Sequence, residues 1–271
     1  MSVASPSDVI VEHEVVTESS SLSPPESIKL KERTPYLQKP NILFVRDSVS
    51  EAANLRILET LTNARIRPAR KVVFNDLEQT VKQNLNNSGR EEFEYLVLSA
   101  PSNVITEMRS SEESSLNENV FKSCKQVIKV AEEALTMKSS LKGVIIMNHS
   151  PRFDSQKMSK LAKTANSILN SEINKSSLKH KISVGVHSLE DFGIGKTHNR
   201  RYLNNITGHY DGLHFFGPSG SLEYTKSLAK AMQNNLVNHS TKINKSSTAN
   251  SQVSSSLLSH NRFSVLGEGN Y

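Results

Sequence analysis

Short apolar runs alternate, between residues 39 and 236, with stretches in which apolar residues recur every three or four positions. Short continuous runs predict buried strands, and the three-and-four spacing predicts amphipathic helices. The strands are expected at residues 41–45, 71–74, 95–100, 143–147 and 182–186. Helices are expected around residues 55–61, 120–135 and 161–169 and from about 221 to 232. A further helix is expected directly after Asp76, which would cap its N-terminus.

Nearly continuous apolar strands that alternate with helices are typical of a parallel sheet covered on both faces. We therefore predict an α/β fold, a three-layer α/β/α domain whose parallel sheet has about five strands in a flavodoxin-like order. In such a sheet, ligands bind beyond the carboxyl ends of the strands. The residues that follow each strand are therefore the first candidates for function.

The two ends of the chain differ from this middle part. Residues 1–38 contain four prolines and eight serines and carry a net charge of −3, and residues 237–271 are rich in Ser, Thr and Asn. Such segments bury too little apolar surface to offset the entropy cost of ordering. We predict a disordered N-terminal tail at 1–38, one folded domain at 39–236 and a disordered Ser/Asn-rich C-terminal tail at 237–271.

Composition excludes several classes of protein. No stretch approaches the roughly 18 consecutive apolar residues of a membrane-spanning helix, and the acidic N-terminus has no apolar run typical of a secretory signal. The one cysteine, Cys124, has no second cysteine for an internal disulfide and lies on an apolar helical stripe, as a core residue does. A cytoplasmic or nuclear protein is expected.

Three of the predicted strand ends carry polar side chains that are able to do chemistry. Ser48 follows the first strand, Asn103 follows the third, and Asp211 and His214 precede the last helix. A carboxylate three residues before a histidine can hold one ring nitrogen while the other faces a hydroxyl. The simpler alternatives are a helix cap for Ser48, a turn residue for Asn103 and a structural pair for Asp211 and His214.

A metal site is a further alternative for this region. His209, Asp211 and His214 are suitable ligand types, but no fourth ligand has convincing spacing. We therefore expect no metal and no other cofactor.

The order of these motifs resembles that of the SGNH (GDSL-type) superfamily of esterases and lipases. Residues 210–227, YDGLHFFGPSGSLEYTKS, and residues 145–154, IIMNHSPRFD, are similar to a divergent group of that superfamily found in invertebrate genomes and retroelement proteins. The resemblance implies a serine hydrolase that cleaves an oxygen ester. It implies Ser48 as nucleophile, His214 as general base, Asp211 as its orienting acid, and an oxyanion hole made by Asn103 and the backbone N–H of Ser48.

The sequence departs from the family pattern around the expected oxyanion hole. Arg46 and Pro101 stand where the family has glycine, Val104 stands where it has aspartate, and residues 74–78 lack the glycine that supplies a second N–H donor. Loss of one oxyanion donor typically costs about 2.7–4 kcal/mol of transition-state stabilisation. The alternative is therefore a catalytically inactive SGNH-like binding or scaffold module of retroelement origin.

Charge suggests further partners besides a small ester. The chain carries a net charge of +6, and residues 39–236 alone carry +7. Arg46 and Arg152 are candidates for binding an anionic group of the substrate, although a surface ion pair is the commoner role for Arg152. Weak electrostatic binding to nucleic acid or an anionic surface is a second interpretation of the basic charge, and an ordinary solvated surface is the simpler one.

Overall fold

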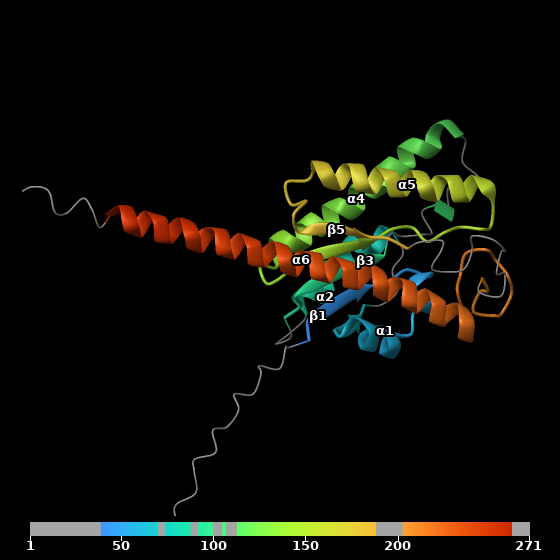
Figure 1. Ribbon diagram of the computed structural model, residues 1–271. Coiled ribbons are helices and arrows are strands. Elements are labelled where there is room, and N and C mark those ends of the chain that lie inside the picture. Colours follow the sequence, from blue (N-terminus) through green and yellow to red (C-terminus); the bar gives the residue numbers. More distant parts are fainter. Residues whose placement is uncertain are drawn as a thin grey trace, which may run out of the picture. The chain divides into compact units, whose positions relative to one another are not determined.

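The computed structural model describes residues 39–69, 74–87, 92–99, 105–106, 113–187 and 203–261, with backbone only for 74, 113–116 and 240–261. These residues form a five-stranded parallel sheet and its covering helices, labelled in Figure 1. The strands are β1 (Asn41–Val45), β2 (Arg65–Pro68), β3 (Tyr95–Ser99), β4 (Gly143–Met147) and β5 (Ile182–Gly185). The helices are α1 (Leu55–Thr62), α2 (Leu77–Asn86), α4 (Glu113–Met137), α5 (Gln156–Lys175) and α6 (Pro218–Asn261), with 3-10 turns η1 (Ser50–Ala52) and η2 (Phe74–Asp76).

The strand order is β2-β1-β3-β4-β5, and every neighbouring pair is parallel. This is the predicted three-layer α/β/α fold with flavodoxin-like strand order. Because all strands run in one direction, their carboxyl ends meet at one edge of the sheet. The segments after β1, β3 and β4 are thereby brought together although they are far apart in the sequence.

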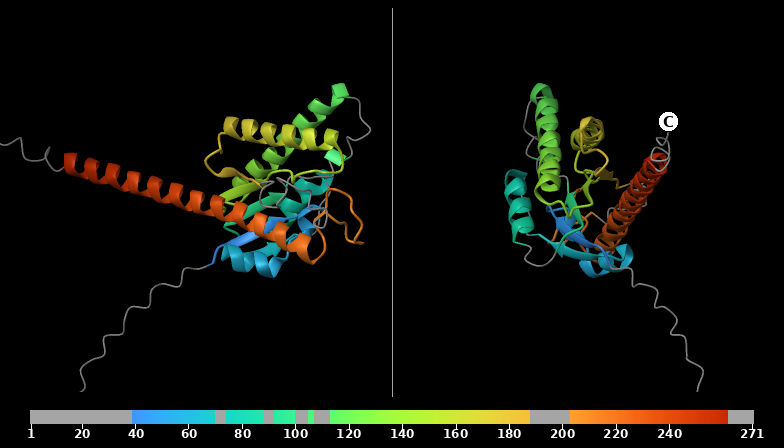
Figure 2. Two further views of the ribbon diagram at one scale, coloured as in Figure 1. Left: turned by 45° about the vertical axis from the view of Figure 1, so that its right-hand side comes forward. Right: turned by 90° about the vertical axis from the view of Figure 1, so that its left-hand side faces the viewer.

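Two hydrophobic clusters, one on each face, hold the layers together. Alternate side chains of β1 face opposite sides, so that Leu43 and Val45 pack with α2, α4 and α5, while Ile42 and Phe44 pack with α1 and α6. Figure 2 shows the two groups of helices on opposite sides of the sheet. Cys124 lies in the first cluster, where burial raises the pKa of its thiol to about 12.

The position of the second strand differs from the sequence expectation. The strand is Arg65–Pro68, Phe74 begins a 3-10 turn, and residues 71–73 lie outside the described part of the chain. A strand at the edge of the sheet needs only one buried residue, here Ile66 between exposed Arg65 and Arg67, so it lacks an apolar run. Proline is also tolerated on an edge strand.

Two helix ends also differ from expectation. Asp76 occupies the N-cap position of α2, but its side chain makes no capping hydrogen bond. Helix α6 continues to Asn261, well past residue 232, where we expected the last helix to end. Ser/Asn-rich composition argues against burial, but residues 221–261 contain neither proline nor glycine, so no helix breaker ends α6 earlier.

No helix among the described residues combines the length and the apolar character needed to cross a membrane.

Candidate active site

The turn after β1 places Ser48 at the carboxyl edge of the sheet. Its shape comes from two neighbours: Asp47 Oδ1 accepts hydrogen bonds from the Ser50 N–H and the Ser50 hydroxyl, both at 2.8 Å, and the Asp47 N–H donates to Ser50 Oγ at 2.8 Å. The N-cap of η1 is Val49, so Ser48 does not cap this turn. The hydroxyl of Ser48 is therefore available for another partner.

Helix α6 holds the segment that follows this turn. Ser221 donates its hydroxyl proton to the Ala52 carbonyl at 2.6 Å, and the Asn54 N–H donates to Thr225 Oγ1 at 2.8 Å. The loop that carries His214 leads directly into α6. The segment after the Ser48 turn and the His214 loop are thus both connected to the first turns of α6.

The loop before α6 brings Asp211, His214 and Ser48 together. Asp211 Oδ1 accepts the backbone N–H groups of Leu213 and His214, both at 2.9 Å, which curls the loop around the carboxylate. Asp211 Oδ2 lies 2.6 Å from His214 Nδ1, and His214 Nε2 lies 3.2 Å from Ser48 Oγ. The imidazole also stacks on Phe216, with ring centroids 5.9 Å apart.

The electrostatics of this group follow from its hydrogen bonds. Burial by itself raises the pKa of Asp211, but the hydrogen bonds from the backbone and ring of His214 and from Leu213 outweigh it and lower the pKa below its ordinary value. An ionised Asp211 accepts a hydrogen bond from Nδ1–H, which leaves Nε2 of the imidazole as an acceptor. The Ser48 hydroxyl then donates a hydrogen bond to Nε2.

The two arginines proposed as substrate contacts lie in different settings. Arg152 has a side chain only 1% exposed, and it donates from Nε and Nη2 to Asp154 and from Nη1 to Thr106. The expected ion pair of Arg152 exists, but it is buried rather than on the surface. Arg46 is partly exposed, and its Nε, which is buried, has no hydrogen-bond partner in the part of the chain that the structure describes.

Several residues singled out from the sequence lie outside the described residues. These are Asn103, Pro101 and Val104. Within the described ranges, no group of three or more His, Cys, Asp or Glu side chains is arranged to hold a metal ion.

Sequence reasoning missed the buried polar residues behind the Ser48 turn. His149 is buried after β4, and burial, partly opposed by Asp47, lowers the pKa of its imidazole to about 4. Tyr224 of α6 is buried beside the same carboxylate, and burial raises the pKa of its phenol, although a hydrogen bond with Ser150 opposes this. The available signal was the polar run from Asn148 to Ser150 directly after an apolar strand.

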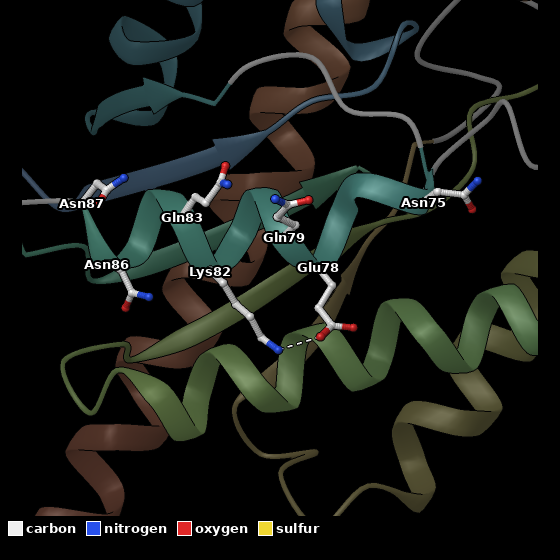
Figure 3. Close-up of a pocket in the computed structure, with 7 residues that line it drawn as sticks. All are labelled: Asn75, Glu78, Gln79, Lys82, Gln83, Asn86 and Asn87. Carbon is white, nitrogen blue, oxygen red and sulfur yellow. Dashed lines mark hydrogen bonds and ion pairs between the residues drawn. The ribbon is translucent and has the colours of Figure 1, made fainter.

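A groove along α2 is unrelated to these residues. Figure 3 shows its lining of exposed amides, with Lys82 bound to Glu78 at 2.6 Å. None of Ser48, Asp211 and His214 contributes to it. We assign it no function.

Comparison with known proteins supplies matches in fold only. No protein-family model and no curated protein matches the chain. Similar solved structures include a catalytic mutant of the acetylxylan esterase Axe2 from Geobacillus stearothermophilus (14% identity, TM-score 0.49, covering 72% of this chain and 93% of that one). Others are the C-terminal catalytic domain of peptidoglycan O-acetyltransferase A from Streptococcus pneumoniae (17%, 0.45, 72% and 93%) and a family 3 carbohydrate esterase from Clostridium thermocellum (12%, 0.45, 71% and 94%).

Proposed function

We propose that this protein is a serine hydrolase that cleaves an oxygen ester, with Ser48 as nucleophile, His214 as general base and Asp211 as the acid that orients the imidazole. The observation that carries the proposal is the continuous chain of contacts from Asp211 Oδ2 to His214 Nδ1 and from His214 Nε2 to Ser48 Oγ, at 2.6 and 3.2 Å. Both distances are within reach of hydrogen bonds for a nucleophile, its base and an orienting group.

In the proposed reaction, His214 Nε2 accepts the proton of Ser48 as Oγ attacks the ester carbonyl carbon. The tetrahedral intermediate collapses, its bond to the alkoxy oxygen breaks, and His214 returns the proton to the leaving alcohol. Water then attacks the acyl-enzyme with His214 again as base, which releases the acid and restores the Ser48 hydroxyl. Every proton transfer passes through Nε2, which Asp211 keeps free by binding Nδ1–H.

The proposed oxyanion hole consists of the Asn103 side-chain amide and the backbone N–H of Ser48. The position of Asn103 in the sequence, after β3, supports this role, because the carboxyl end of β3 lies beside that of β1. The segment after β2, residues 69–78, contains no glycine donor, so each remaining donor carries a larger share of the charge stabilisation. The substrate class is a small ester, and the basic charge of the domain gives no reason to propose nucleic acid as a partner.

Labelling with a fluorophosphonate probe tests the proposal, because this probe forms a covalent bond only with an activated serine. The wild-type protein is expected to be labelled and to hydrolyse an aryl acetate. Ser48→Ala abolishes both activities, whereas the matched variant Ser167→Ala, at an exposed serine of α5, retains both.

The opposite outcome assigns the protein to the alternative class. Absence of labelling in the wild type, together with equal hydrolysis by wild type and Ser48→Ala, would identify an inactive SGNH-like binding or scaffold module. The departures at Arg46 and Pro101 are the sequence features that favour that alternative.

A further inference from the structure

A buried ion pair lies in the loop after β4. Arg152 donates from Nε to Asp154 Oδ1 at 3.0 Å and from Nη2 to Asp154 Oδ2 at 2.6 Å. The two side chains are 1% and 6% exposed, whereas Lys82 and Glu133, a surface pair, are 44% and 32% exposed. A buried pair seldom adds net stability, because desolvation of two charges offsets their attraction. Its position therefore suggests a role other than stability.

The same guanidinium reaches the segment after β3. Arg152 Nη1 donates to Thr106 Oγ1 at 2.9 Å. Thr106 lies three residues after Asn103, the proposed oxyanion donor. Arg152 thus links the loop after β4 to the segment that carries Asn103.

The loop fixed by this pair also contacts the loop of Asp211 and His214. The Phe153 N–H donates to the Gly212 carbonyl at 2.7 Å. Gly212 has a φ of +69°, and a Cβ there would lie 2.6 Å from the Asp154 backbone nitrogen and 2.7 Å from the Phe153 carbonyl carbon. The backbone at 153–154 is therefore packed directly against the residue that follows Asp211.

From these contacts we infer that Arg152 is a positioning residue of the hydrolase site, one that holds residues 105–106 and the Asp211–His214 loop in register with each other. The inference rests on the proposed function and replaces the substrate-binding role expected for Arg152. It follows from the three guanidinium nitrogens of Arg152, each of which donates to a protein acceptor, and from a side chain too buried to meet a substrate. This positioning role requires a planar guanidinium whose N–H groups point in fixed directions. The ammonium group of lysine lacks that geometry.

Arg152→Lys tests the inference, since lysine keeps the charge but loses the bidentate fork. We expect kcat for an aryl acetate to fall about 10- to 100-fold with KM changed less than about threefold, because misplacement of groups by about 1 Å acts on the transition state. The matched control Lys82→Gln breaks a surface pair on α2 and leaves kcat unchanged (Figure 3).

The proton NMR signal of His214 Nδ1–H gives a second readout that needs no turnover. Arg152→Lys is expected to shift or broaden this signal, and Lys82→Gln is expected to leave it in place. If the wild type shows no Ser48-dependent hydrolysis, the proposed function fails, and the NMR signal alone still decides whether Arg152 positions the His214 loop.

A purely structural role predicts a different pattern. Arg152→Lys would then lower the melting temperature while kcat and the Nδ1–H signal of the folded protein stay at wild-type values, which overturns the inference. If Arg152→Lys does not fold, Thr106→Val removes the acceptor of Arg152 Nη1. That variant is expected to lower kcat about three- to tenfold, and an unchanged kcat overturns the inference equally.

Discussion

The acid–base half of the candidate site lies within four consecutive residues, Asp211 to His214, whereas the nucleophile half draws on separate strand ends. Asp211 binds both the backbone and the ring of His214, so the short segment itself fixes their geometry. Ser48 instead follows β1, and Asn103 follows β3 in the sequence, outside the described residues. The self-contained half matches the motif of the superfamily that the sequence resembles, and the departures at Arg46 and Pro101 fall in the other half.

This difference indicates which half of the candidate site tolerates substitution of the surrounding residues. A segment whose hydrogen bonds are internal keeps its geometry as long as its own residues are kept. A site assembled from strand ends responds to changes in any of its neighbours. The following predictions test the two halves separately.

Asp211→Asn is expected to have the largest effect. Asparagine keeps an oxygen for the N–H groups of Leu213 and His214 but can place an amide NH₂ opposite Nδ1, which favours the wrong tautomer of His214. We expect kcat to fall by about 10⁴-fold with the fold retained. Kinetics with an aryl acetate and circular dichroism test this, and wild-type kcat in the variant would contradict the orienting role.

Gly212→Ala tests how closely the acid–base loop is packed. A Cβ at Gly212 meets the backbone of Asp154, and the positive φ adds strain, so the free energy of unfolding should fall by about 3 kcal/mol. Gly208 also has a positive φ, of +84°, but open space around it, so Gly208→Ala should cost only about 1 kcal/mol. Urea unfolding measures both, and equal losses would contradict the close packing.

Asn103→Ala tests the nucleophile half. We expect kcat to fall about a hundredfold or more with KM little changed, because the amide acts on charge that exists only in the transition state. Steady-state kinetics on an aryl acetate measure kcat and KM separately. An unchanged kcat, with activity still lost in Ser48→Ala, would show that the oxyanion hole is built from other donors.

The pH dependence of stability tests the buried polar residues behind the Ser48 turn. The folded-state pKa of His149, about 4, lies below its ordinary value of 6.5, so the unfolded chain binds the proton first as pH falls. This imidazole should therefore lower the free energy of unfolding by about 2 kcal/mol between pH 7 and pH 5. His149→Phe should remove this part of the difference in unfolding free energy between pH 7 and pH 5, which urea unfolding at both pH values measures. An unchanged difference would contradict a buried neutral imidazole.

The sequence allowed much of the fold and the candidate contacts to be predicted, because both depend on local patterns. Apolar runs placed β1 and β4, and the Asp-x-x-His spacing brought Asp211 and His214 within hydrogen-bond distance. Edge strand β2 was misplaced because a half-exposed strand has no apolar run. The proposed role of Arg152 was not predictable either, since its contact with Thr106 and the packing of its loop on Gly212 join residues 46 to 59 positions apart.

Arg46→Gly should have the smallest effect and bears directly on the comparison of the two halves. Glycine stands at this position in the superfamily that the sequence resembles, and it relieves crowding beside the turn of Ser48, so activity on a neutral aryl acetate should rise by less than about tenfold. The substitution also removes a cation whose Nε has no hydrogen-bond partner among the described residues, so hydrolysis of a matched ester with a free carboxylate should rise less or fall.

The ratio of kcat/KM for the two esters separates these effects, because crowding alters both esters alike and charge alters only the anionic one. Arg56→Gly, at an exposed arginine of α1, controls for the loss of net charge and should leave the ratio unchanged. A ratio that is the same in wild type and Arg46→Gly would leave Arg46 without a role in binding an anionic substrate. A loss of activity on both esters would instead show that the nucleophile half has come to depend on the arginine.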